Sequence, residues 1–379
     1  MKKTIIIFLL TIYLISPISF AQEEIINSEI ESLKISDLIQ EGEKYTQETF
    51  KDINLDETLQ NALKGNIDNK SIYSKLLAIA GEEVIDAIRI LASFLIIVVI
   101  SSILKNVADN LENKSVAQIT YYIIYILIVT LIMTNFSEII SNIKETISNL
   151  IGITNSLIPI LLALMTATGN GISATAIEPI ILTVIIFVAN TITSFILPIV
   201  LVATAMSIVS NLSENVQIDK LSKSIKSGIL WFLGILTTGF TMVLSFEGTL
   251  TSNVDGITAK TLKTSVSTFV PVVGKALSES ADTVLGCTSI LKNAIGIVGM
   301  IIIVGICAAP IIKLTILTAM YKVSSAICEP ISDKRIVNLL EQMSSTFKVL
   351  LGIMFFISAL IIIGLAITLK ISNSTIMYR

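Results

Sequence analysis

The side chains that most often carry catalytic chemistry are scarce in this sequence. Histidine is absent from all 379 residues, which excludes a histidine general base, Ser-His and Cys-His nucleophile pairs, and histidine metal ligands. The three cysteines, Cys287, Cys307 and Cys328, are odd in number and too far apart for metal-ligand spacing. Neither of the common glycine-rich phosphate-binding patterns occurs. We therefore expect no enzymatic activity, no cofactor, no metal and no use of ATP by the chain itself.

Partner binding remains as the chemistry open to this chain, and residues 258–294 are the strongest candidate for it. This stretch is too polar to span a bilayer, yet it lies between two segments that can. Pro271 and Gly274 separate two apolar stripes at helical spacing. The pattern predicts a membrane-surface hairpin or a re-entrant segment, or else an ordinary loop with two short helices. The residues expected to contact partners or line a conduit are Phe269, Pro271, Gly274, Leu277, Ser278, Asp282, Gly286 and Cys287.

Composition predicts an all-α, polytopic membrane protein. Hydrophobic residues make up 53% of the chain and charged residues 15%, whereas about a quarter of a soluble domain is charged. The mean hydropathy is +0.85. A nucleic-acid partner is not expected, because the sequence has no basic cluster with interleaved aromatic residues. The lipid bilayer is thus the first partner that the sequence predicts.

The first part of the chain is expected to leave the cytoplasm. Residues 1–21 have the positive start, short apolar run and small final residues of a cleavable signal peptide, and the alternative is an uncleaved anchor. Residues 22–86 are predicted to form a small, acidic, helical extracytoplasmic region, with a helix stop at Gly65-Asn66. This region has too few apolar residues for a core of its own, so it needs a partner or the membrane. The alternative is a partly disordered linker.

Apolar runs of about twenty residues predict eight membrane spans. A first group occupies residues 87–246, an extracytoplasmic amphipathic or re-entrant segment covers 247–293, and the last two spans lie in 294–379. The run 176–212 is about twice the length of one span, so we divide it near its polar midpoint into two spans joined by a tight turn. The predicted spans are Ala87–Leu104, Ala117–Phe136, Leu150–Thr168, two within Ala176–Leu212, Ile225–Phe246, Ala294–Met320 and Phe347–Leu369.

The distribution of charged residues predicts how the protein is oriented in the membrane and argues against one class of transporter. With the N-terminal region outside, most lysines and arginines near the span ends fall on the cytoplasmic side, as the positive-inside rule requires. We expect no Asp, Glu or Lys at the middle of a span, which argues against an ion- or proton-coupled transporter. Gly296, Gly299 and Gly305 predict close packing of helices, within the chain or between subunits.

Several stretches resemble a known family. The matching stretches are Phe269–Ser278, Asp282–Cys287 and Leu291–Gly296, with weaker matches at Leu157–Met165, Tyr45–Asp56 and Leu63–Gly65. On these residues the chain resembles the stage III sporulation protein AE family of endospore-forming bacteria, over essentially the whole mature chain. The resemblance supplies no catalytic or ligand-binding residue.

The resemblance implies a multi-pass protein of the mother-cell-derived outer forespore membrane, with its N-terminal region between the two membranes. It also implies a channel or secretion-like complex with other stage III sporulation A-operon membrane proteins, a separate ATPase and a partner in the forespore membrane. We expect the acidic region to dock a basic partner surface through Glu41 and Glu43. Two alternatives stay open from the residues alone: a stand-alone permease for a small solute, and an assembly scaffold without a pore role.

Overall fold

The protein is a bundle of long helices. The computed structural model describes residues 24–374 except 48, 50–52, 67–68, 110–113, 213–217 and 243–272, and within these ranges it contains no strand. The all-α prediction is therefore confirmed for the described part of the chain. The predicted signal peptide, residues 1–21, lies outside the described residues.

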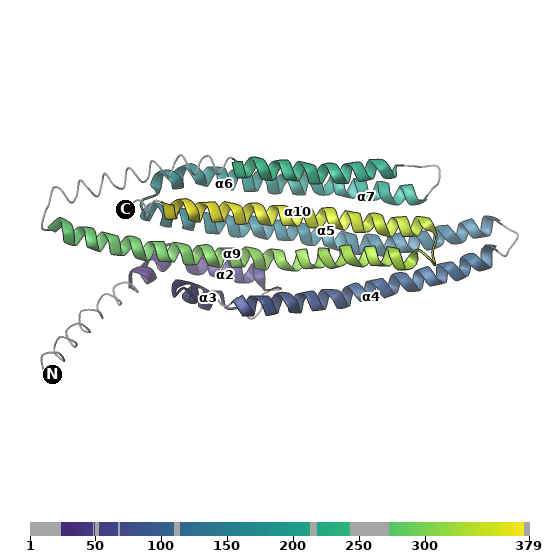
Figure 1. Ribbon diagram of the computed structural model, residues 1–379, viewed down its shortest axis with the longest axis horizontal. Helices are drawn as coiled ribbons and strands as arrows, with labels where there is room; N and C mark the ends of the chain where they lie inside the picture. The colour runs from purple at the N-terminus through teal and green to yellow at the C-terminus, as the bar shows by residue number, and fades with distance from the viewer. Residues whose placement is uncertain are drawn as a thin grey trace, which may run out of the picture.

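The helices lie side by side along the long axis of the molecule (Figure 1). Residues 24–32 are helical, and we call the helix Asp219–Met242 the outer helix. The other elements are α2 (Ile35–Thr46), α3 (Leu55–Leu63), α4 (Asn69–Asp109), α5 (Lys114–Ala167), α6 (Gly171–Thr191), the π-helical segment η1 (Ile192–Ile196), α7 (Leu197–Leu212), α9 (Val273–Cys328) and α10 (Lys334–Ser374). Helix α9 touches α2, α3, α4, α5 and α10, so it forms the centre of the bundle.

Buried apolar side chains from these helices form one continuous core. Close approach at glycines helps to build it: a Cβ atom on Gly296 would lie 2.5 Å from a methyl group of Leu369, and one on Gly299 would meet Leu157. Such contacts let helix backbones pack closely, as the small residues predicted. The two helix groups predicted at 87–246 and 294–379 therefore share a single core.

Helix α5 joins two predicted spans that we expected to be separated by a loop. It runs for 54 residues without a break, which corresponds to roughly 80 Å. The polar stretch that suggested a loop also contains Ile139, Ile143 and Ile147, which are buried at one-turn intervals. This spacing continues the helix through Glu138 and Lys144, because the apolar face stays in contact with the core.

The tight turn predicted within residues 176–212 is wrong. Helices α6 and α7 follow each other through η1, so the run is one continuous helical rod. A π-helical turn commonly forms where the regular ladder of hydrogen bonds is interrupted, and Pro198 has no N–H to donate to it. The threonine hydroxyls at the polar midpoint form hydrogen bonds within the same helical rod. Thr191 and Thr193 donate to the carbonyls of Phe187 and Ala189 at 2.8 and 3.0 Å.

The eight separate spans are not confirmed. Among the residues that the structure describes, five helical stretches are long and apolar enough to cross a membrane: Tyr122–Ala167, Pro179–Leu212, Asp219–Met242, Val284–Cys328 and Lys334–Lys370. Several of them greatly exceed the ~20 residues that a bilayer requires. The coarser prediction, a polytopic α-helical protein with several apolar helices, agrees with the structure.

Candidate functional site

The predicted partner motif lies at the start of α9, as far as the structure describes it. Phe269 and Pro271 lie outside the described residues, and Gly274, Leu277, Ser278 and Asp282 fall within the helical part that begins at Val273. The helix continues through Ala294, so the predicted second amphipathic helix and the next predicted span form one element. We had expected a boundary between them.

The residue after the end of this motif contacts the chain's own N-terminal region. Gly286 is exposed and Cys287 is buried. Directly after them, the Thr288 hydroxyl donates to a carboxylate oxygen of Glu29 at 2.5 Å. The three cysteines form no disulfide with one another. The residue that directly follows the motif is therefore engaged in a contact within the chain.

The acidic N-terminal region packs against the bundle and does not form a core of its own. Its buried apolar residues, which face α5 and α9, are Ile35, Leu38, Ile39, Leu55 and Leu59. Helix α3 begins after Asn54, whose side chain accepts a hydrogen bond from the Glu57 N–H at 3.0 Å. It ends before Gly65, whose φ of 75° confirms the predicted stop. The partner that the sequence required is the chain's own bundle.

Two glycines let α2 lie close to the bundle. A Cβ atom on Gly42 of α2 would lie 2.5 Å from a methyl group of Ile302 in α9. On the other side, a Cβ on Gly152 of α5 would lie 2.7 Å from the hydroxyl oxygen of Tyr45. Since real Cβ atoms do not approach other atoms this closely, both positions require glycine for the observed packing.

The carboxylates proposed for partner docking are used within the chain. Glu41 accepts hydrogen bonds from Tyr45 at 3.0 Å and from Ser156 at 2.5 Å. Glu43 accepts a longer bond from the backbone N–H of Leu55 at 3.4 Å. Glu41 thus ties α2 to α5, and Glu43 links α2 to the start of α3.

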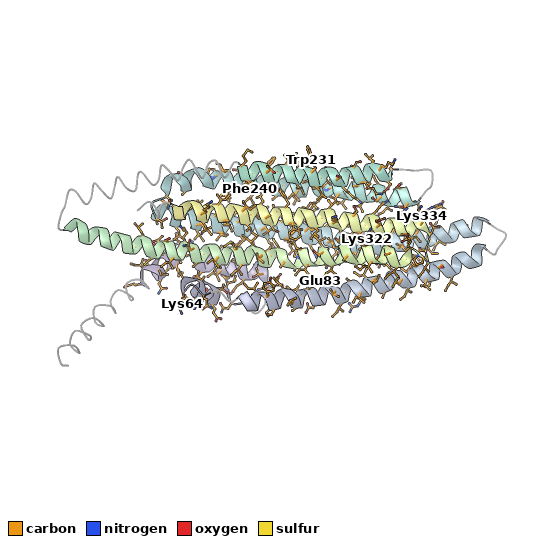
Figure 2. All side chains as sticks on the ribbon, viewed as in Figure 1. Lys64, Glu83, Trp231, Phe240, Lys322 and Lys334 are labelled. Carbon is orange, nitrogen blue, oxygen red and sulfur yellow. The ribbon has the colours of Figure 1, made fainter. Side chains whose placement is uncertain are left out.

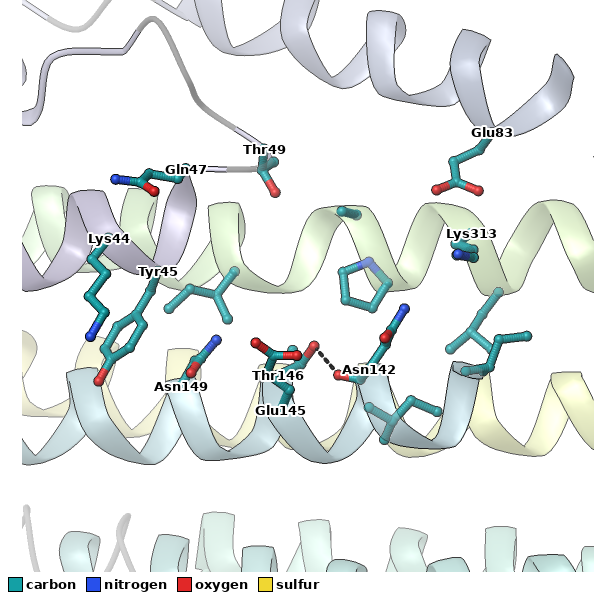
Figure 3. Close-up of a pocket in the computed structure, with 16 residues that line it drawn as sticks. Lys44, Tyr45, Gln47, Thr49, Glu83, Asn142, Glu145, Thr146, Asn149 and Lys313 are labelled. Atoms are coloured by element: carbon teal, nitrogen blue, oxygen red, sulfur yellow. Dashed lines mark hydrogen bonds between the residues drawn. The ribbon is translucent and has the colours of Figure 1, made fainter. Parts of the chain in front are cut away.

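A polar cavity lies between the end of α2, helix α4 and the two central helices α5 and α9 (Figure 3). Its volume is about 330 Å³. The polar and charged residues that line it are Lys44, Tyr45, Gln47, Thr49, Glu83, Asn142, Glu145, Thr146, Asn149 and Lys313. The sequence analysis did not predict this site, because its residues come from four separate segments.

Charges of both signs face this cavity. The Lys313 ammonium pairs with Glu138 at 3.1 Å. Burial raises the pKa of the Glu83 carboxyl above its ordinary value, and the nearby Lys313 partly opposes that shift. Burial also raises the pKa of Tyr45, and the hydrogen bond to Glu41 adds to the effect. The cavity therefore offers ammonium and carboxylate groups together with side-chain amides and hydroxyls.

Pro310 also lines the cavity wall. Proline has no N–H, so it cannot make the helical hydrogen bond to the carbonyl of Ile306, which also lines the cavity. The arrangement is suited to holding a polar or zwitterionic group by hydrogen bonds and ion pairs. It carries binding chemistry more readily than covalent chemistry.

A second polar cluster is buried between α7, α10 and the outer helix. Lys226 is 3% exposed, and its ammonium donates to the Ser207 hydroxyl and to the Gln342 carbonyl, each at 3.2 Å. The Gln342 side-chain amide donates to Asp219 and accepts from Asn211, the latter at 3.2 Å.

Lys226 and a fully buried lysine, Lys292 in α9, are charged groups inside the bundle, although neither lies at the middle of a predicted span. Lys226 is the second residue of the predicted span Ile225–Phe246, and Lys292 precedes the predicted span Ala294–Met320, so the sequence analysis did not consider either as an interior charge. A signal was present in the sequence. Ser207 and Asn211, and likewise Ser222 and Lys226, stand four residues apart on otherwise apolar helices, which puts each pair on one face.

Comparison with known proteins decides the family. The profile described as Stage III sporulation protein AE matches residues 53–372. The chain belongs to the stage III sporulation protein AE family. A relative, the stage III sporulation protein AE of Bacillus subtilis (strain 168), is 26% identical over 314 residues, which cover 82% of this chain and 77% of that protein. No solved structure matches.

Membership of the stage III sporulation protein AE family confirms the resemblance seen in the sequence. The motif residues Phe269 to Cys287 lie within the matched range, as do the α4, α5 and α9 walls of the cavity. The wall formed by Lys44, Tyr45, Gln47 and Thr49 precedes that range. The family profile therefore covers three of the four segments that build the cavity.

Proposed function

We propose that this protein is a membrane subunit of a multi-protein, channel- or secretion-like complex that acts during stage III of sporulation. The observation that carries the proposal is the family match over residues 53–372, because it connects the chain to sporulation. The five long apolar helices support a membrane location. In this proposal the membrane is the mother-cell-derived outer membrane around the forespore.

The proposed orientation has the N-terminal region between the two membranes. Helix ends and turns that carry lysine and arginine lie at one end of the bundle, where Lys322 and Lys334 are labelled in Figure 2. Lys220, Lys223 and Arg335 belong to the same end. The positive-inside rule assigns this end to the cytoplasm. Helices α2 and α3, docked near the opposite end, then face the intermembrane space (Figure 1).

The subunit is proposed to act with partners and without catalysis of its own. A separate ATPase, other stage III sporulation membrane proteins and a forespore-membrane protein complete the complex. Asp56 and Glu57 are exposed in the first turn of α3, and they offer a negative surface on the intermembrane side. These exposed carboxylates suit a basic partner surface better than Glu41 and Glu43, which are bonded within the chain.

The polar cavity favours a second candidate function, a permease for a small polar solute. Its mixed charges lie inside a bundle of apolar helices, as in sites that bind zwitterionic solutes. Vesicles that contain only this protein separate the two candidates. Uptake of a zwitterionic amino acid that is lost in a Lys313→Met variant would support a permease, whereas vesicles without uptake favour the subunit role.

A deletion strain tests the sporulation role directly. We expect cells without this gene to start sporulation and stop at stage III, and a plasmid copy of the full chain to restore spores. Normal spore numbers in the deletion strain would contradict the proposal.

A further inference from the structure

We propose that the lipid bilayer crosses this bundle obliquely, covering one end of α4 and α5 on one side and the middle of the outer helix on the other. The inference needs only that the chain spans a membrane. It does not depend on the sporulation complex or on its partners.

The first lipid-facing surface lies on α4 and α5. No Asp, Glu, Lys or Arg occurs between Arg89 and Lys105 in α4, or between Lys114 and Glu138 in α5. Large apolar side chains in these runs point outward: Ile96, Val99, Ile100, Ile103, Ile119, Tyr122, Ile123, Ile126 and Leu127 are all exposed. The α4 run of fifteen residues is roughly 22 Å long, and lysine or arginine at its ends can reach the headgroups.

The second lipid-facing surface lies on the outer helix. From Ser227 to Met242 this helix has no ionisable residue. Its exposed large side chains include Trp231 at 73%, Met242 at 56% and Ile235 at 49%. Trp231 lies at the outer edge of the bundle (Figure 2). An uncharged face with this much exposed apolar area is unusual in water and ordinary in hydrocarbon.

Contacts between helices show that these two surfaces are displaced along the bundle. Phe94, the fifth of the fifteen residues of the α4 run, packs edge-on against Tyr321 with 5.4 Å between ring centroids. The lysine after Tyr321 pairs with Glu341 at 2.5 Å, and Lys226 donates to the carbonyl of the next residue, Gln342, at 3.2 Å. The uncharged run of the outer helix therefore begins close to the level where the α4 run begins.

From that level the two surfaces extend in different directions. The outer helix runs parallel to α10, because Leu230 packs against Gly352 and Phe240 packs against Gly364. It thus extends toward the docked N-terminal helices, while the α4 run extends away from them to Lys105. Together the two surfaces span on the order of 45 Å along the axis, more than the ~30 Å of hydrocarbon in a bilayer.

Charged groups exclude a bilayer perpendicular to the axis at the level of the outer helix's middle. On the opposite side, that level carries the exposed pair Asp86 and Arg89, 2.9 Å apart, together with Glu83 and the partly exposed Lys313. Charges in hydrocarbon are costly unless they can reach water. An oblique bilayer keeps these groups in water, and tilts up to about 40° occur among membrane helices.

Leu77 and Ile235 allow a matched test, because they lie at about the same level on opposite sides of the bundle. Leu77 is six residues before the cavity residue Glu83. Ile235 is five residues after Leu230, which contacts Gly352 of α10 at the level of the cavity. Both side chains are exposed. A bilayer perpendicular to the bundle axis would place both side chains in the same environment. An oblique bilayer would place Ile235 in hydrocarbon and Leu77 in water.

The chain contains a single tryptophan, Trp231, which is a native fluorescent probe. We would reconstitute the full chain in phosphatidylcholine vesicles with and without brominated acyl chains, which quench tryptophan in hydrocarbon. Aqueous iodide quenches tryptophan in water. The same measurements are then made on Leu77→Trp, Ile100→Trp and Ile235→Trp, each in a Trp231→Phe background. Circular dichroism checks that each variant keeps its helix content.

We expect brominated lipid to remove most of the emission of Trp231, Ile100→Trp and Ile235→Trp, and iodide to leave it unchanged. Leu77→Trp should show the reverse behaviour. Equal quenching of Leu77→Trp and Ile235→Trp by brominated lipid would overturn the oblique arrangement. Protection of Ile235→Trp from both quenchers would also overturn it, because protein would then cover the outer helix.

Discussion

The Tyr45 hydroxyl occupies the space that a side chain at Gly152 would need, 2.7 Å from the position of its Cβ atom. This contact holds α2 against α5. Gly152→Ala should push Tyr45 away and loosen the N-terminal region, at a cost of about 1–3 kcal/mol in the free energy of unfolding. Thermal unfolding in detergent and protease cleavage between α2 and α3 would measure the loss.

Gly81→Ala is the matched control for that change. Gly81 is also inside a helix, but a Cβ there would meet nothing within 4 Å, so alanine should be neutral or stabilising. In a Tyr45→Phe background, which removes the closest atom, Gly152→Ala should cost less. An equal cost in both backgrounds would show that the Tyr45 contact does not set the packing.

The buried Lys226 is predicted to be replaceable by an apolar residue of similar size. Lys226→Met removes the cost of burying an ammonium group. Both of its acceptors keep another donor: the Ser207 hydroxyl lies 2.7 Å from that of Ser222, and the Gln342 carbonyl accepts from Thr346 at 3.0 Å. The melting temperature in detergent should therefore stay the same or rise, and spores should still form.

Gln342→Leu is predicted to behave differently. It removes the partner of Asn211 and of Asp219 at once, which should cost about 1–2 kcal/mol through poorly satisfied buried polar groups.

A variant Lys226→Met that is stable yet forms no spores would contradict a purely structural role for the ammonium group.

Glu83 should give the protein a pH-dependent stability. Because burial raises its pKa in the folded state, the folded protein favours the neutral carboxyl. Below the unfolded-state pKa, the group is neutral in both states and costs nothing. As pH rises through the folded-state pKa, the ionised carboxyl becomes unfavourable and stability falls.

Glu83→Gln should remove this contribution. The difference in melting temperature between Glu83→Gln and the unaltered protein should be small at acidic pH and grow in favour of the variant toward neutral pH. Lys313→Met should enlarge the difference, because Lys313 opposes the shift. A difference that shrinks as pH rises would show that the sign is wrong.

The two classes of acidic residue in the N-terminal region should respond differently to charge reversal. Glu41→Lys breaks the bonds from Tyr45 and Ser156, so the region should become sensitive to protease. The combined Asp56→Lys and Glu57→Lys change alters exposed positions and should leave protease resistance intact while weakening capture of the partner complex. Unchanged capture would exclude docking through this face of α3.

The sequence predicted those features that follow from local pattern. Helical spacing and composition indicated an all-α membrane protein, and Gly65 indicated the end of α3 through its need for a left-handed backbone. The continuity of α5 and of the α6–α7 rod was not predicted. Polar residues such as Lys144 and Thr193 suggested loops, whereas in the structure the helix hydrogen bonds and the buried apolar face continue past them.

The sites were harder to predict than the helices, because they depend on distant segments meeting. The cavity joins Lys44, Glu83, Glu145 and Lys313 from four helices, and no spacing in the chain relates them. Hydropathy likewise marked α9 and α10 as spans, yet the most apolar windows in both are 56% buried within the bundle. A hydropathy profile does not distinguish core from lipid contact, and only packing separates the two.

Affinity purification of the tagged full chain from sporulating cells, with mass spectrometry of what accompanies it, tests the central claim most directly. The proposal predicts a large membrane assembly that contains other stage III sporulation membrane proteins and an ATPase in fixed proportion. The chain should be absent from such an assembly in cells that are not sporulating. Recovery of the chain from sporulating membranes as a single protein, with transport activity of its own, would contradict the claim.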